Sequence, residues 1–239
     1  MTPIIEEKNV TEKLINSIRE TYDRLAVDYA GHIFGELAHK PFDRQLLDRF
    51  AAEVAPHGPV CDLGCGPGHV ALYLRDVGTT VFGVDLSPCM VEQARQLNPS
   101  ISFQEGNMLA LEVANDHLAG IVAFYAIVNF PEESLSLAFR EMFRVLQPGG
   151  LLMLAFHVGD ETLRPTDLWG HAISMDFHLF PVGTIERCLE AAGFVILEVL
   201  EREPYPPDVE YQSRRAYVLA RKPSSSSRMV SLHSVTGDL

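Results

Sequence analysis

One ten-residue stretch, VCDLGCGPGH from Val60 to His69, constrains this chain more than any other. Its first residues are apolar and predict a short buried strand. Glycines then alternate at 64, 66 and 68, and an amphipathic helical pattern follows. A strand, a glycine turn and a helix in that order gather backbone N–H groups at the positive end of a helix dipole. The stretch predicts an anion-binding turn, although an ordinary tight turn before a helix has the same pattern.

The segments after this turn alternate between strand and helix patterns. The strand patterns are nearly continuous apolar runs, which are typical of a parallel sheet covered by helices on both faces. Strands are predicted at 59–63, 79–84, 101–104, 120–126 and 151–156, and helices at 68–77, 88–97 and 131–146. The fold class predicted is α/β, with a Rossmann-like, doubly wound sheet that is mostly parallel.

The chain before the first strand is expected to be helical. Apolar residues recur at helical spacing over 11–34, after a loose end at residues 1–10, and Pro41 suits the first turn of a second helix. We assign residues 1–40 to an N-terminal helical cap and residues 41–222 to the sheet domain.

The chain after the fifth strand departs from the alternation. Residues 157–180 are irregular and rich in histidine and aromatic residues, and we expect a lid insertion there. The strand patterns at 194–200 and 211–220 have no helix pattern between them, so they predict an antiparallel pair at one edge of the sheet. Residues 223–239 begin with a run of four serines, 224–227, and show no periodicity, which predicts a disordered tail.

Charge and cysteine content narrow the class of function. The net charge of −13 and the pI near 5.1 argue against general binding to nucleic acid or to anionic membranes. Cys61, Cys65, Cys89 and Cys188 form no CxxC pair, so we expect reduced thiols and a cytoplasmic protein. We expect no signal peptide and no membrane span. The oligomeric state is left open between monomer and dimer.

Two aspartates refine the ligand expected at the glycine turn. Asp85 ends the second strand, 21 residues after Gly64, where a carboxylate accepts hydrogen bonds from a ribose diol or, alternatively, caps the next helix. Asp62 stands just before the glycines, where it would repel a pyrophosphate and attract an amino group. The two acids together favour a nucleoside that carries an amino acid.

Four motifs follow one another along the chain in the order that a known protein family has. Residues 61–68 (CDLGCGPG) resemble the first motif of class I S-adenosylmethionine-dependent methyltransferases, and residues 83–90 (GVDLSPCM) resemble their second. Residues 106–108 (GNM) and 146–150 (LQPGG) stand where that superfamily has further signatures. The resemblance covers about residues 20–222 and is closest to the small-molecule methyltransferases, whose N-terminal motif is similar to residues 22–29. It implies S-adenosylmethionine as cofactor and S-adenosylhomocysteine as product.

The resemblance also implies a role for individual residues. Asp62, Gly64 and Gly66 would line the methionine part of the cofactor, with Cys65 between them. Asp85 would hold the ribose. Asn107, where the superfamily often has Asp, would pair with the adenine edge. The remaining residues expected around the cofactor are Leu86, Met90, Met108, Tyr125 and Ala126, with Tyr22 and Tyr29 closing over it from the first helix.

The acceptor side is predicted from position alone. His157 ends the fifth strand and is a candidate general base, and Tyr22 is the second candidate catalytic residue. Candidate substrate-binding residues are Trp169, His171, His178 and Arg214, and the pair Arg214–Arg215 could bind an acidic acceptor. Each of these residues also has an explanation that does not involve substrate: the first three could be partly buried residues of the lid, and Arg214 could lie at a solvated strand edge. The histidines lack metal-ligand spacing, so no metal site is expected.

The function predicted is methyl transfer from S-adenosylmethionine to a small-molecule acceptor, without nucleic-acid or membrane partners. A general base is needed only for an acceptor that arrives protonated. Two alternatives stay open: an NAD-dependent oxidoreductase, and a non-catalytic module that binds S-adenosylmethionine.

Overall fold

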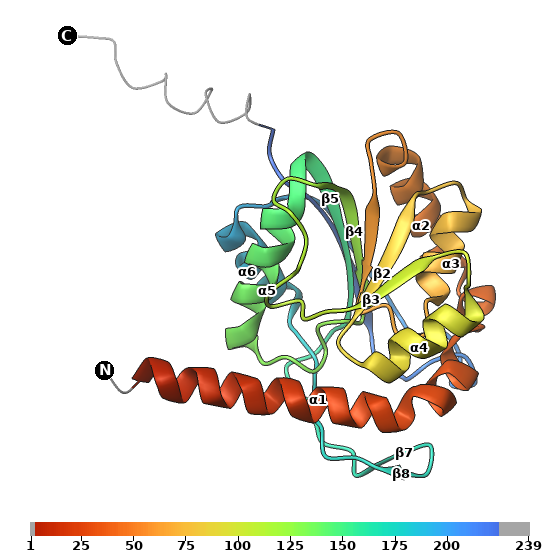
Figure 1. Ribbon diagram of the computed structural model, residues 1–239, viewed down its shortest axis with the longest axis vertical. Coiled ribbons are helices and arrows are strands. Elements are labelled where there is room, and N and C mark those ends of the chain that lie inside the picture. Colours follow the sequence, from red (N-terminus) through yellow and green to blue (C-terminus); the bar gives the residue numbers. More distant parts are fainter. Residues whose placement is uncertain (1–2, 225–239) are drawn as a thin grey trace.

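The protein is built on one seven-stranded sheet with helices on both faces (Figure 1). The computed structural model describes residues 3–224. The strand order is β10-β11-β5-β4-β1-β2-β3. The strands are β1 (Val60–Leu63), β2 (Val81–Asp85), β3 (Ser102–Glu105), β4 (Leu118–Phe124), β5 (Leu146–His157), β10 (Val195–Arg202) and β11 (Arg215–Arg221). The predicted Rossmann-like, mostly parallel sheet is confirmed.

The predicted antiparallel pair is confirmed, and the structure places its reversed strand. β11 runs antiparallel to both β5 and β10, so the reversed strand lies one position inside the edge. β10 is the outermost strand of that side. The connection over residues 203–214 contains no helix, which suits this pairing, since antiparallel neighbours need no crossover helix.

Two groups of helices cover the two faces. α2 (Pro41–Val54) and α3 (His69–Asp76) pack on one face, while α5 (Glu132–Val145) and α6 (Val182–Ala192) pack on the other (Figure 1). Leu47 of α2 and Phe139 of α5 are both fully buried against the sheet. The central strands β1 and β4 are therefore covered on both sides, which explains their continuous apolar runs.

The first helix is longer than the sequence pattern indicates. α1 spans Pro3–Ile33, so the expectation of a loose end over residues 1–10 is wrong from Pro3 onward. Proline is well tolerated in a first helical turn because its missing N–H needs no partner there. α1 packs on α4 (Pro88–Leu97) and runs across the carboxyl edge of the sheet, and the short helix η1 (Glu36–His39) links it to α2 (Figure 1).

Helix ends follow local chemistry. Ser87 caps α4 by accepting a hydrogen bond from the Met90 amide at 3.1 Å, as its Ser-Pro sequence predicts. Gly193 ends α6 with a φ of +104°, a conformation that glycine adopts without strain. β5 begins at Leu146, earlier than predicted, because the segment expected to be only a turn also pairs with β4 through Leu118.

The predicted lid consists of two short antiparallel ribbons. β6 (Thr162–Leu163) pairs with β9 (Phe177–His178), and β7 (Asp167–Leu168) pairs with β8 (His171–Ala172). The second ribbon lies beyond α1 in Figure 1. Most of the predicted tail, residues 225–239, lies outside the described residues.

Candidate functional site

The first cavity opens at the carboxyl ends of β1, β2 and β4, with α1 across it. Its empty volume is about 660 Å³. Most of the residues predicted to bind the cofactor line it: Tyr22, Tyr29, Gly64, Gly66, Asp85, Leu86, Met90, Asn107, Met108, Tyr125 and Ala126. Ile18, Phe124, Asn129 and Phe130 also line it and were not predicted. The topology thus brings motifs from distant parts of the sequence to one edge of the sheet.

The glycine turn leaves backbone exposed to this cavity. Gly64 and Gly66 have φ values of +70° and +50°. A Cβ at Gly64 would lie 2.5 Å from the Ala126 Cβ, which is a clash, so Gly64 is required by packing. A Cβ at Gly66 would meet nothing nearer than the Tyr29 ring at 3.6 Å. Gly66 therefore borders open space, where a ligand can approach the main chain.

Asp85 joins the end of β2 to the glycine turn. Its Oδ2 accepts a hydrogen bond from the Gly66 amide at 2.8 Å, and its Oδ1 accepts one from the Ser87 amide at 2.9 Å. Burial raises the pKa of Asp85 to about 6, against the effect of these hydrogen bonds. Each carboxylate oxygen keeps a second lone pair for a ligand hydroxyl.

Asn107 offers a hydrogen-bond donor to the cavity. Its Oδ1 accepts from the Leu109 amide at 2.9 Å, which is an Asx-type turn. Because an amide N–H only donates, this contact identifies the oxygen and leaves the Nδ2 hydrogens for a ligand. From the sequence, Asn107 could pair with a ligand through its oxygen or its nitrogen. In the structure the oxygen is already bonded, so the nitrogen is the group left for a ligand.

Tyr22 is held by its hydroxyl. The hydroxyl donates to Asn129 Oδ1 at 2.9 Å, and Asn129 Nδ2 donates to the carbonyl of Asp176 in the lid at 2.8 Å. Burial, followed by the nearby Asp85, raises the pKa of Tyr22. Tyr22 therefore stays protonated at neutral pH and connects α1 to the lid.

Asp62 does not line the cavity where most of the predicted cofactor residues lie. It is 2% exposed, and its Oδ2 accepts a hydrogen bond from the Ala71 amide in the first turn of α3 at 2.9 Å. Burial raises its pKa to about 7. Neither cavity is lined by Asp62, so its direct contact here is with the helix N-terminus.

A second cavity adjoins the first. Its empty volume is about 720 Å³, and it shares the wall formed by Tyr29, Gly64, Gly66, Phe124 and Tyr125. The rest of its lining is Ile33, Glu36, Lys40, Cys65, Pro67, His69, His157, Val209, Glu210, Tyr211 and Arg215. Of the predicted residues, Cys65 and His157 lie here rather than in the first cavity.

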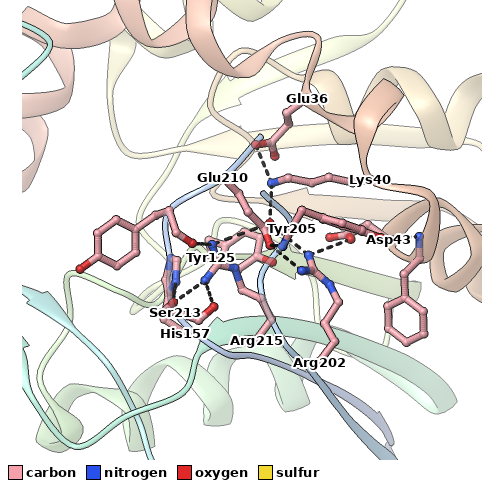
Figure 2. Close-up of polar contacts among 12 residues, drawn as sticks. Glu36, Lys40, Asp43, Tyr125, His157, Arg202, Tyr205, Glu210, Ser213 and Arg215 are labelled. Carbon is pink, nitrogen blue, oxygen red and sulfur yellow. Dashed lines mark hydrogen bonds and ion pairs between the residues drawn. The ribbon is translucent and has the colours of Figure 1, made fainter. Parts of the chain in front are cut away.

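Buried charges line this second cavity (Figure 2). Glu210 accepts hydrogen bonds from both Arg202 terminal nitrogens, at 2.5 and 3.1 Å, and from the Tyr205 amide at 2.7 Å. Lys40 pairs with Glu36 at 2.8 Å and lies 3.5 Å from Glu210. Hydrogen bonds from Arg202 and Tyr205 and the charge of Arg215 lower the Glu210 pKa to about 2, although burial opposes them.

His157 lies in the wall of the second cavity with one nitrogen engaged. Its Nδ1 is 2.8 Å from Ser213 Oγ. Burial, Arg215 and Lys40 lower the pKa of His157 to about 3, so the imidazole is neutral at pH 7.

The residues predicted to bind substrate line neither cavity. Trp169 stacks on His32 of α1 with ring centroids 4.4 Å apart. His171 lies 2.6 Å from Asp28, and His178 lies 3.0 Å from Thr162 within the β6–β9 ribbon. Arg214 is exposed and pairs with Glu201 and Glu203. Through these contacts, Trp169 and His171 attach the segment 157–180 to α1.

Sequence reasoning missed Glu36, Lys40 and Glu210 as site residues. In the sequence, the pair Arg214–Arg215 was the feature that indicated a charged site. Only one of the two side chains can line that site, because adjacent residues of an extended chain point to opposite faces. Arg215, which is 2% exposed, lies in the cavity wall, while Arg214 faces solvent.

Among the described side chains, those of residues 11–224, no set of three or more His, Cys, Asp or Glu is arranged to hold a metal ion. None of the helices that the structure describes has the length and hydropathy that crossing a membrane requires.

Comparison with known proteins identifies the fold and the motifs. Residues 60–150 match a family described as a methyltransferase domain. The chain is 28% identical over 133 residues to malonyl-[acyl-carrier protein] O-methyltransferase of Enterobacter lignolyticus, covering 55% of this chain and 52% of that protein. It is 30% identical over 147 residues to demethylmenaquinone methyltransferase of Chlorobaculum parvum, covering 59% and 60%. The chain spans about half the length of the first curated relatives it matches.

Solved structures agree on the fold. A SAM-dependent methyltransferase from Methanosarcina mazei superposes with a TM-score of 0.64 at 18% identity, covering 70% of this chain and 93% of that one. Residues 60–150 thus match a methyltransferase domain, and the sheet order and this superposition show the fold that solved SAM-dependent methyltransferases share.

Proposed function

We propose that this protein transfers a methyl group from S-adenosylmethionine, bound in the first cavity, to a small-molecule acceptor bound in the second. The observation that carries the proposal is the wall common to both cavities, from Gly64 and Gly66 to Phe124 and Tyr125. Because the two cavities share these lining residues, they adjoin at one edge of the sheet, and a ligand in one lies next to a ligand in the other. Methyl transfer requires such a meeting, because the acceptor atom must lie in line with the bond that breaks.

The first cavity fits S-adenosylmethionine, the cofactor that the methyltransferase-domain match implies. Asp85 has lone pairs left for ribose hydroxyls, Asn107 has free amide hydrogens for an acceptor nitrogen of adenine, and Gly66 has space in place of a side chain. Asp62 does not line this cavity, so we assign it to the support of the glycine turn rather than to contact with the methionine group.

Methyl transfer at this site requires little chemical participation by the protein side chains. S-adenosylmethionine, when bound, supplies an electrophilic methyl group on a sulfonium whose leaving thioether is neutral. The chain contributes alignment and exclusion of water. Tyr22 and Tyr29 of α1 cover the first cavity, and Tyr125, with a φ of +55°, separates it from the second.

Ligand-dependent melting tests the cofactor assignment. S-adenosylhomocysteine should raise the melting temperature in proportion to the logarithm of its concentration, whereas NADH should leave it unchanged. Stabilisation by NADH alone would favour an oxidoreductase and overturn the proposal.

A labelled methyl group tests the acceptor class. Protein incubated with methyl-labelled S-adenosylmethionine and a cell extract should produce a labelled small molecule that chromatography separates from the unreacted cofactor, and a heat-inactivated sample should not. Label retained in protein or nucleic acid would contradict a small-molecule acceptor. Cofactor binding with no label in any fraction would favour a non-catalytic module.

A further inference from the structure

A three-residue chain of hydrogen bonds fixes the orientation of the His157 ring (Figure 2). Arg215 Nη1 donates to Ser213 Oγ, and that oxygen lies 2.8 Å from His157 Nδ1. A guanidinium only donates, so Ser213 accepts from Arg215. Among the side chains and backbone described for residues 11–224, His157 Nδ1 is the one acceptor within hydrogen-bond distance of the Ser213 hydroxyl, so the hydroxyl proton goes to Nδ1 and the ring proton of the neutral imidazole is on Nε2. No group in the same range hydrogen-bonds to Nε2.

The surroundings of this nitrogen favour negative charge. Arg215 and Lys40 are almost fully buried, and their charged groups lie 5.5 and 5.6 Å from the centre of the Tyr125 ring. The same two cations, with burial, lower the pKa of His157, which means that positive charge on the imidazole is disfavoured there. A field that disfavours a cation favours an anion at the same place.

The acids of the cavity wall are already paired. Glu210 is held by Arg202 and the Tyr205 amide, and Glu36 by Lys40 and His69, and the pKa of each is lowered to about 2. Both oppose the effect of Arg215 and Lys40 at His157, but as weaker contributions. Because these acids offset only part of the positive charge of Arg215 and Lys40, a monoanion fits this wall better than a dianion.

We propose that the second cavity recognises a carboxylate on the methyl acceptor, and that His157 donates Nε2–H to it, with Ser213 and Arg215 holding the ring. This inference rests on the proposed function, because it places the acceptor in the second cavity. It also reverses the role predicted for His157 from the sequence, since a ring that presents N–H to the acceptor is a donor and not a base.

Nitrogen NMR of the full chain, labelled at histidine and saturated with S-adenosylhomocysteine, tests both parts. His157 should show the tautomer with the proton on Nε2. Titration with acetate should shift its Nε2 signal, whereas acetamide, which has nearly the same shape without charge, should bind at least about tenfold more weakly. Acetate is small enough to enter whatever the shape of the true acceptor.

His178 is the internal control for this experiment. Its Nδ1 also faces a hydroxyl, that of Thr162 at 3.0 Å, but it lines neither cavity. Acetate should leave its signals unchanged. A proton on Nδ1 of His157, an equal response to acetate and acetamide, an equal response at His178, or tighter binding of inorganic phosphate than of acetate would each overturn the inference.

Three variants distinguish loss of the hydrogen-bond donor at residue 157 from loss of the folded structure. His157→Gln keeps an N–H donor and should retain most acetate binding, His157→Leu should lose it, and Ser213→Ala should give a mixture of tautomers at His157. All should still bind S-adenosylhomocysteine. If the unaltered protein fails to bind that ligand, the proposed function fails. If it binds the ligand but shows no preference for acetate, only the carboxylate inference fails.

Discussion

Asp85 Oδ2 accepts a hydrogen bond from the Gly66 amide at 2.8 Å, so the end of β2 is tied directly to the glycine turn that follows β1. This contact joins the two motifs that the sequence separates by a helix. It also means that the carboxylate is positioned before any ligand arrives. Pre-positioned groups bind ligands with a smaller loss of conformational freedom.

Binding of S-adenosylhomocysteine should depend on the ionisation of Asp85. Its pKa is raised to about 6, so the carboxylate that accepts from hydroxyls is complete above that pH and is lost as the pH falls below it. Affinity should fall by up to about tenfold per pH unit below 6. Calorimetry from pH 5 to 8 measures this. Asp85→Asn should bind weakly with a flat profile, whereas Asp62→Asn should keep the dependence; a dependence that survives in Asp85→Asn assigns it elsewhere.

Alanine at three glycines should have three different outcomes. Gly78→Ala meets no atom within 4 Å at a φ of +94° and should cost about 1–2 kcal/mol from backbone strain alone. Gly66→Ala should cost a similar amount and reduce affinity for S-adenosylhomocysteine about 100-fold, because its methyl group enters the cavity. Gly64→Ala adds the clash with Ala126 and should cost about 3 kcal/mol or more.

Chemical denaturation and calorimetry separate these three cases. Gly78→Ala is the control for strain without a neighbour. Normal cofactor affinity in Gly66→Ala would contradict the placement of the ligand against this turn.

Removing the Tyr22 hydroxyl should destabilise the protein. Tyr22→Phe leaves Asn129 Oδ1 without its donor in a partly buried place, at a cost of about 1–2 kcal/mol. Tyr73→Phe removes an exposed hydroxyl that donates to Asp48 and should change stability by less than about 0.5 kcal/mol. Urea denaturation of both variants measures the difference, and equal effects would mean that the contact from α1 to Asn129 contributes nothing.

Glu210 should be far more important to stability than an exposed acid. Glu210→Gln leaves Arg202, Lys40 and Arg215 without their common counter-charge, and about 3–5 kcal/mol should be lost. Glu201→Gln breaks the exposed pair with Arg214 and should cost less than about 1 kcal/mol.

The pH dependence of the Glu210 contribution follows from its low pKa. The folded-state value of about 2 lies below the ordinary value of 4.5. The stabilisation is therefore complete above about pH 4.5 and decreases as the pH falls toward 2. Acid denaturation of Glu210→Gln should lack this component, while Glu201→Gln should retain it.

The first cavity was largely predictable because its signals are local. A glycine turn between a strand and a helix, and an aspartate at the end of the next strand, are each set by a few consecutive residues. Parallel strands then bring their carboxyl ends to one edge, so residues such as Gly66 and Asp85 meet whenever the alternation of strands and helices is right. Asp62 was harder, since only the fold shows that its carboxylate caps α3.

By itself, the amino-acid sequence determined the sheet, the turn and the class of cofactor, because hydrophobic period and glycine placement act over short stretches. Only the tertiary structure decided which charges meet in the second cavity. Lys40 and Glu36 come from the segment before α2, whereas Glu210, Ser213 and Arg215 come from the end of the chain. Nothing in a local pattern encodes that meeting. Burial also distinguishes the neighbours Arg214 and Arg215, because Arg214, just before β11, is exposed to water, whereas Arg215 at the start of β11 lies in the cavity wall.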